Sequence, residues 1–130
     1  MKSTLAFTLA TAAVAGVALA GTAGAAAPAP ATRILLTVTS DATGDIEAAL
    51  LGCRPTGGTH PEAEAACEEL RAAGGDFDQL PVTPDAICPM VYDPVTATAE
   101  GTYDNEPVTW KKTYANACLL SVETGKVFAF

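Results

Sequence analysis

The chain has 130 residues, with 15 acidic side chains against seven Lys and Arg, and a formal net charge of −8 at pH 7. A protein this acidic repels the phosphates of nucleic acid, so we exclude a nucleic-acid partner. Its four cysteines lack the close paired spacing of a zinc knuckle or a dithiol redox motif, so we expect no metal and no cofactor.

The N-terminal segment has the features of a secretory signal peptide. Lys2 supplies a positive charge, residues 5–20 are mostly apolar, and Ala23-Gly24-Ala25 matches the small residues that signal peptidases accept. A membrane anchor is the alternative, but the apolar run is short, glycine interrupts it, and no basic cluster follows. We therefore expect residues 1–25 to be removed and the mature protein to be secreted, extracellular and not bound to a membrane.

The remaining chain is enough for one small domain but not for a deep core. Residues 26–32 contain only Ala and Pro apart from Thr32, and we expect them to form a flexible N-terminal arm before a domain at 33–130. β-Branched and apolar residues predict strands at 33–40 and 46–53, paired across the turn residues 41–45.

A helix is predicted next, ending near Ala73 at a pair of glycines. Thr59 and Glu62 have the spacing of a capping box at its start. The apolar residues recur at helical spacing on one face, and Cys67 lies on that face, from which it could reach Cys53.

The C-terminal half is predicted to be mainly strand. After a loop at 76–85, strands are expected at 95–103 and 108–114, and a short terminal strand at 127–130. Lys112 interrupts the apolar face of the second of these strands, so that face should be only partly buried. These elements add up to a five-stranded, mainly antiparallel sheet with a helix packed against it.

An even number of cysteines behind an export signal predicts two disulfides among Cys53, Cys67, Cys88 and Cys118. The cysteine count alone leaves three pairings open.

His60 is the only histidine, so any histidine-based catalysis would depend on it. It precedes Pro61 at the expected helix start, and the cysteines are better explained as disulfides than as nucleophiles. We interpret His60 as a surface or capping residue and predict that the protein is not an enzyme.

The segment from Asp85 to Val95 is the most informative for function. It places the apolar residues 90–92 between Pro89 and Pro94, which restrict themselves and the residues before them to extended conformations. A protease cleft accepts a stiff, extended chain, and Cys88 would tether it to the domain. The alternative is that residues 90–92 form a buried strand, with the methionine filling a gap in the core.

The run Cys88-Pro89-Met90-Val91-Tyr92-Asp93-Pro94-Val95 resembles the Streptomyces subtilisin inhibitor family. Further similarities lie at 58–61, 74–76 and 127–130, and in Asn116, two residues before Cys118, so the resemblance extends over about residues 35–130. It implies an α+β fold with a five-stranded antiparallel sheet, two short helices and two disulfides, which join Cys53 to Cys67 and Cys88 to Cys118.

The same resemblance implies a secreted, homodimeric inhibitor of subtilisin-like serine proteases. Because Met90 is long, flexible and apolar, chymotrypsin-like enzymes are a second expected partner class. The resemblance places the reactive bond at Met90-Val91 and a reversible, substrate-like mechanism there. The binding loop would also include Ile87, Cys88, Pro89 and Tyr92, and Asn116 would support it from behind. The short arm, and Tyr103 where the family often has Trp, depart from the family pattern at the expected dimer contacts.

Two competing functions stay open. One is a secreted structural or adhesion domain, which predicts no protease inhibition. The other is a regulator or substrate of an extracellular crosslinking (transglutaminase) system, which can coexist with inhibition.

Overall fold

The computed structural model describes residues 12–13, 16–18, 21, 24 and 31–130. The expected signal peptide and arm therefore lie mostly outside the described residues. Thr32, expected as the last residue of the arm, is instead buried and begins the first strand. Within the described part, no helix is both long enough and apolar enough to cross a membrane.

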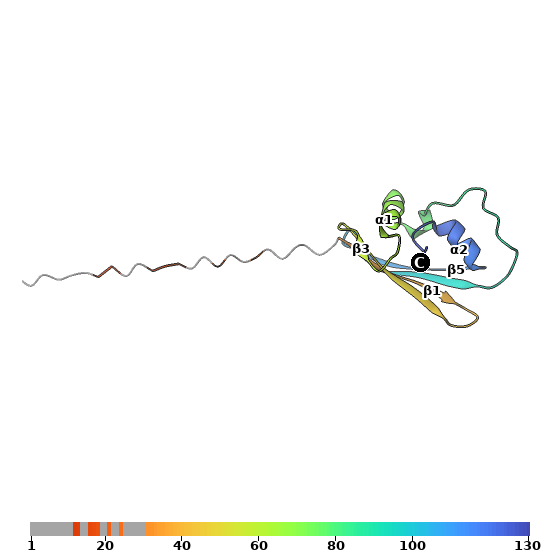
Figure 1. The fold of residues 1–130 in the computed structure, drawn as a ribbon, viewed down its shortest axis with the longest axis horizontal. Coiled ribbons are helices and arrows are strands. Elements are labelled where there is room, and N and C mark those ends of the chain that lie inside the picture. The colour runs from red at the N-terminus through yellow and green to blue at the C-terminus, as the bar shows by residue number, and fades with distance from the viewer. Residues whose placement is uncertain (1–11, 14–15, 19–20, 22–23, 25–30) are drawn as a thin grey trace, which may run out of the picture.

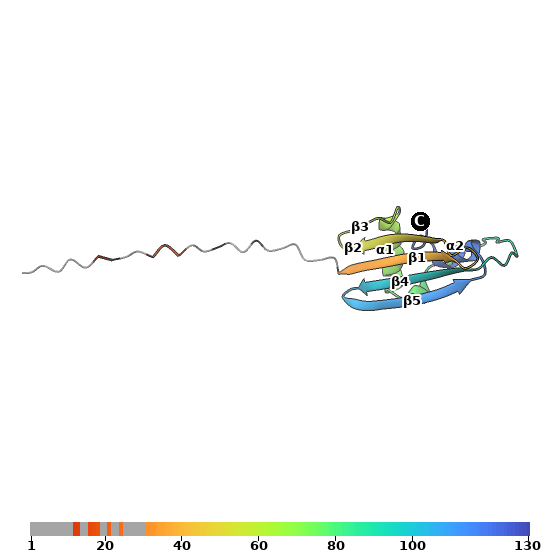
Figure 2. The ribbon, with the colours of Figure 1, turned by 90° about the horizontal axis from the view of Figure 1, so that it is seen from below.

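A single antiparallel sheet of five strands forms the base of the fold, in the order β3-β2-β1-β4-β5 (Figures 1 and 2). The strands are β1 (Thr32–Ser40), β2 (Ile46–Cys53), β3 (Gly57–Gly58), β4 (Val95–Tyr103) and β5 (Glu106–Tyr114). The expected α+β fold and the two expected hairpins, β1-β2 and β4-β5, are thus confirmed.

The fifth strand is not the one that the sequence predicted. Residues 127–130 form no strand. The fifth strand is β3, which consists of two glycines and pairs with β2 at the edge of the sheet. The backbone N–H of Val127 instead donates to the carbonyl of Thr124 at 3.3 Å, in a turn. Val127 and Phe128 are buried against the sheet, so burial and not strand pairing explains the apolar alternation at the C-terminus.

The first helix, α1, spans Ala63–Ala72, and its expected capping box is wrong. Its N-cap is Glu62, which makes no side-chain capping hydrogen bond. The hydroxyl of Thr59 accepts a hydrogen bond from the N–H of Leu50 at 2.8 Å, and so joins the chain after β3 to β2. The Thr59 hydroxyl, which was expected to cap the helix, is therefore bound to β2.

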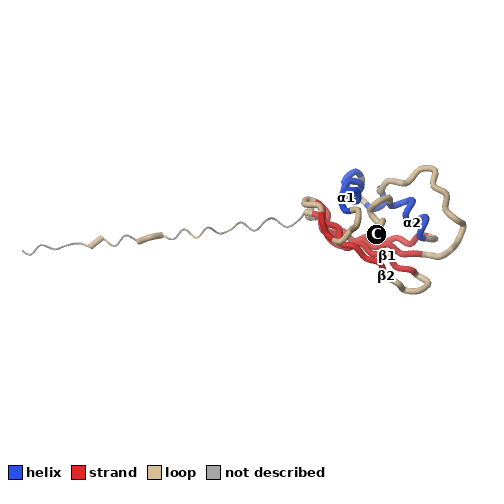
Figure 3. Tube along the Cα trace, in the orientation of Figure 1, coloured by secondary structure: helices blue, strands red, loops and turns tan. Residues whose placement is uncertain are grey.

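A second helix, α2 (Ala117–Thr124), follows β5, as the family resemblance implied and the residue patterns did not. A short 3-10 helix, η1 (Phe77–Gln79), lies in the segment expected to be loop. Figure 3 shows the helices on one side of the strands, so the sheet is covered on one face. The core lies between the two layers, with Ile34, Leu36, Leu51, Leu70 and Val127 fully buried in it.

Candidate functional site

The segment between η1 and β4 extends from the body of the domain as a long loop (Figures 1 and 3). Residues 86–94 have no regular secondary structure. The side chains of Ile87 and Met90 are 94% and 103% exposed, and Tyr92 is also exposed. Since large apolar side chains normally bury, their exposure here points to a contact surface, and the alternative of a buried strand is wrong.

One disulfide tethers this loop to α2, through Cys88 and Cys118. The second joins Cys53 at the end of β2 to Cys67 in α1. This is the pairing that the family resemblance implied, and it places one covalent link directly beside the exposed segment.

Asn116 lies behind the loop and binds it on both sides of the Met90-Val91 bond. Its Nδ2 donates to the carbonyl oxygens of Pro89 at 3.2 Å and Val91 at 2.9 Å. Its Oδ1 accepts from the N–H of Leu119 at 2.9 Å, as the N-cap of α2. The side chain is only 6% exposed, so water competes little for these hydrogen bonds.

Backbone hydrogen bonds hold the loop at three further points. The N–H of Thr83 donates to the carbonyl of Val122 in α2 at 2.8 Å, and the N–H of Asp93 donates to the carbonyl of Ala115 at 2.9 Å. The chain before the exposed residues and the chain after them are therefore both attached at α2 or next to it.

The third point is Pro94, whose carbonyl accepts from the N–H of Asp41 in the β1-β2 turn at 3.0 Å. Asp41 also accepts a hydrogen bond from the hydroxyl of Thr96, the second residue of β4, at 2.9 Å. The sequence predicted only a turn at residues 41–45, because no local pattern shows that this turn contacts the end of a loop at Pro94, far along the chain.

A shallow hollow of about 250 Å³ lies where the loop meets the start of α2. It is lined by the loop residues 89–92 together with Ala115, Asn116 and Leu119. The exposed loop is thus supported from behind by an asparagine and a disulfide and carries its apolar side chains outward.

His60 takes no part in this site. It is buried, its Nδ1 accepts from the N–H of Glu62 at 3.0 Å, and its Nε2 lies 3.0 Å from the carbonyl oxygen of Val127. These partners place the ring proton on Nε2, where it donates to that carbonyl. The expected surface position is wrong, and the histidine joins the start of α1 to the C-terminal segment.

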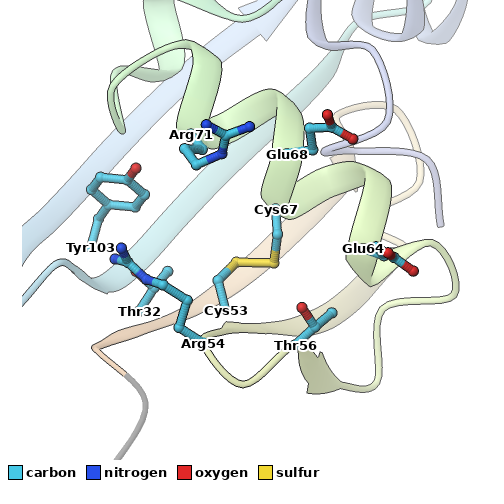
Figure 4. Close-up of a pocket in the computed structure, with 9 residues that line it drawn as sticks. All are labelled: Thr32, Cys53, Arg54, Thr56, Glu64, Cys67, Glu68, Arg71 and Tyr103. Carbon is cyan, nitrogen blue, oxygen red and sulfur yellow. A yellow bond between two sulfur atoms is a disulfide. The ribbon is translucent and has the colours of Figure 1, made fainter.

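A second hollow, of about 240 Å³, lies at the opposite end of the sheet (Figure 4). It is bordered by the Cys53–Cys67 disulfide and by side chains of both charges, among them Arg54, Arg71, Glu64 and Glu68. No group of three or more His, Cys, Asp or Glu side chains able to hold a metal ion occurs within the described ranges.

Comparison with known proteins relates this chain to protease inhibitors. Residues 29–116 match a family model described as subtilisin inhibitor-like. The chain is 46% identical over 86 residues to Subtilisin inhibitor-like protein 5 of Streptomyces fradiae, which covers 65% of this chain and 80% of that protein. It is 40% identical over 110 residues to Subtilisin inhibitor-like protein 15 of Streptomyces bikiniensis, which covers 77% of this chain and 97% of that protein.

A solved structure is also similar. It is the crystal structure of Streptomyces caespitosus sermetstatin in complex with Bacillus licheniformis subtilisin, matched with a TM-score of 0.63 and 35% sequence identity. The match covers 75% of this chain and 97% of that chain.

Proposed function

The chain belongs to the subtilisin inhibitor-like family of protease inhibitors, and from that premise we propose that it inhibits subtilisin-like serine proteases by presenting Met90-Val91 as a substrate-like bond. The protein is accordingly an inhibitor and not an enzyme. The observation that carries the proposal is the full exposure of Met90 on a loop whose backbone is held on both sides of that bond.

The loop resembles a substrate that is already ordered for binding. A protease cleft binds an extended chain with one side chain in its specificity pocket. Here, two prolines, a disulfide and Asn116 restrict the chain before any protease arrives. The entropic cost of ordering is met during folding, so the contacts with the protease contribute more fully to affinity.

The same attachments explain why cleavage would be reversible. The protease serine attacks the Met90 carbonyl carbon, and the new amino group is that of Val91. The disulfide still joins Cys88 to Cys118, and Asn116 still donates its hydrogen bond to the Val91 carbonyl. The chain ends at Met90 and Val91 therefore both remain next to α2. The amino group of Val91 is then positioned to attack the acyl-enzyme and reform the bond, because its effective concentration is high.

Met90 defines the expected class of protease. Its side chain is long, flexible and apolar, and therefore fits the broad apolar pockets of subtilisin-like and chymotrypsin-like enzymes. The negatively charged pocket of trypsin offers it no partner. We expect a Kd below ~10⁻⁹ M for subtilisin and much weaker binding to trypsin.

Incubation of the secreted protein with subtilisin tests this function. Mass spectrometry should show a 1:1 complex in which any cleavage is confined to Met90-Val91, while activity titration should reach a sharp end point. Subtilisin that stays fully active with micromolar protein, or that digests the chain throughout, would contradict the proposal.

We also propose that the protein is a homodimer that uses the uncovered face of the sheet. Both helices lie on the other face (Figure 3). The uncovered face presents Leu35 and Ile46, and Ile46 is 65% exposed. An uncovered apolar sheet face favours association with a second copy.

Sedimentation analysis tests the dimer. Leu35→Glu should produce a monomer, whereas Val82→Glu, at an apolar residue that is also exposed but lies outside the sheet, should leave the dimer intact. A parent protein that sediments as a monomer at micromolar concentration would refute this part of the proposal.

Secretion is a further part of the proposed function. We propose that residues 1–25 are a signal peptide, that 26–31 form the arm, and that the inhibitor domain covers 32–130, since Thr32 is already part of β1. Sequencing the N-terminus of the protein from the culture medium should give a start close to Ala26. Retention of residues 1–25 on a cell-bound protein would argue against export by this route.

A further inference from the structure

Met90 is chemically unusual among the sulfur-containing residues of this chain. The chain has two methionines and four cysteines, and the other methionine is Met1, in the segment expected to be removed. All four cysteines are in disulfides. After processing, Met90 would therefore carry the only sulfur that is not already in a disulfide.

We propose that Met90 is an oxidation site, and that conversion of its thioether to the sulfoxide by a peroxide weakens the inhibitor. The inference rests on the proposed function, in which Met90 enters the specificity pocket of the protease. Its chemical basis is the full exposure of the side chain, which lets a small oxidant reach the sulfur without any opening of the fold.

The reaction balances with hydrogen peroxide as the only oxidant. A lone pair of the Met90 sulfur attacks one peroxide oxygen, a sulfur–oxygen bond forms, and the oxygen–oxygen bond breaks. The proton on the transferred oxygen moves to the departing hydroxide, which leaves as water. The sulfur loses two electrons, and the peroxide is reduced to one molecule of water. One oxygen atom is added to the protein, and no other bond in the chain changes.

The sulfoxide changes the end of the side chain that the protease contacts and leaves the loop attachments unchanged. Asn116 binds the loop through the carbonyl oxygens of Pro89 and Val91, and the disulfide acts through Cys88. None of these contacts uses the Met90 side chain. The free inhibitor should therefore keep its fold and its loop conformation after oxidation.

Binding to a protease should weaken because the pocket is apolar. The sulfoxide oxygen is a strong hydrogen-bond acceptor that water solvates in the free inhibitor, and an apolar pocket offers it no donor. Burying an unpaired polar group of this kind should raise Kd by about 10- to 100-fold. Enzymatic reduction of the sulfoxide should restore the original Kd.

The test compares treated and untreated samples of the same protein. The secreted protein is exposed to hydrogen peroxide, the peroxide is removed with catalase, and the Kd for subtilisin is measured. Peptide mapping should locate a single added oxygen at Met90, and the loss of tight binding should follow the fraction oxidised. The thermal unfolding midpoint should not change.

Met90→Leu is the matched control, because leucine is apolar and cannot form a sulfoxide. Whatever its starting Kd, this variant should show the same Kd before and after peroxide. Equal Kd values for the thioether and sulfoxide forms of the parent, or equal loss of binding by the variant, would overturn the inference. If the untreated parent does not inhibit subtilisin, the proposed function itself fails, and the two failures are thereby distinguished.

Discussion

Asn116 stabilises both α2 and the exposed loop, and one substitution can separate the two roles. Asn116→Asp keeps an Oδ1 acceptor for the N–H of Leu119. It replaces the Nδ2 donor by a second carboxylate oxygen that faces the carbonyl oxygens of Pro89 and Val91. We expect the cap of α2 to survive, since Asp is as good an N-cap as Asn and its charge suits a helix N-terminus. The loop should lose its support.

The size of the effect follows from the two hydrogen bonds that are lost. Each contributes about 0.5–1.5 kcal/mol, so together they amount to about 2 kcal/mol. Because the released loop must be ordered again when the protease binds, this sum corresponds to a rise in Kd of about 30-fold. Repulsion between the carboxylate and the two carbonyl oxygens acts in the same direction.

Three measurements check this prediction: the Kd for subtilisin, the rate at which Met90-Val91 is cleaved, and the thermal unfolding midpoint. Asn105→Asp is the matched control, because it adds the same charge at the only other asparagine, in the β4-β5 turn at the opposite end of the sheet. Asn105 has a φ of 65°, a conformation that Asp tolerates. An Asn116→Asp protein that binds as tightly and is cleaved as slowly as the control would refute the supporting role of Asn116.

Three further predictions concern specificity, the tether and alkaline stability. Met90→Lys should lower the Kd for trypsin by at least about tenfold, because lysine can pair with the buried carboxylate of the trypsin pocket; no gain would show that another side chain enters the pocket. Replacing Cys88 and Cys118 together by serine should produce a substrate that subtilisin digests within hours, as followed by mass spectrometry, whereas lasting inhibition would exclude the disulfide from the mechanism. Burial raises the pKa of Tyr114, and the hydrogen bond with Glu123 raises the pKa of Lys112. The folded state thus holds these protons more tightly than the unfolded state, so the free energy of unfolding should fall as the pH rises above about 10. Thermal unfolding from about pH 8 to pH 11.5 should show this fall, and Tyr114→Phe should make it shallower.

The sequence predicted α1 and the strands of both hairpins because their signals are local. The strands at 46–53 and 95–103 follow from β-branched and apolar residues bounded by turn residues. Lys112 was expected to leave its strand face only partly buried, and it is exposed, with Nζ 3.1 Å from the carboxylate of Glu123 in α2. Residue patterns did not predict α2, although Asn116, a favoured N-cap residue, stands directly before it.

The restricted, extended character of residues 88–94 was also determined by the sequence alone, because proline limits its own φ and the residue before it regardless of the rest of the fold. The family resemblance named Asn116 as a support, but only the tertiary structure decided which hydrogen bonds hold that loop. Asn116 binds it on both sides of Met90-Val91, and Asp41 binds the carbonyl of Pro94 from a turn distant in sequence. The tertiary structure also decided that the Thr59 hydroxyl accepts a hydrogen bond from the N–H of Leu50 and does not cap α1. Dihedral limits act within one or two residues, whereas the partner of a hydrogen bond depends on which segments folding brings together.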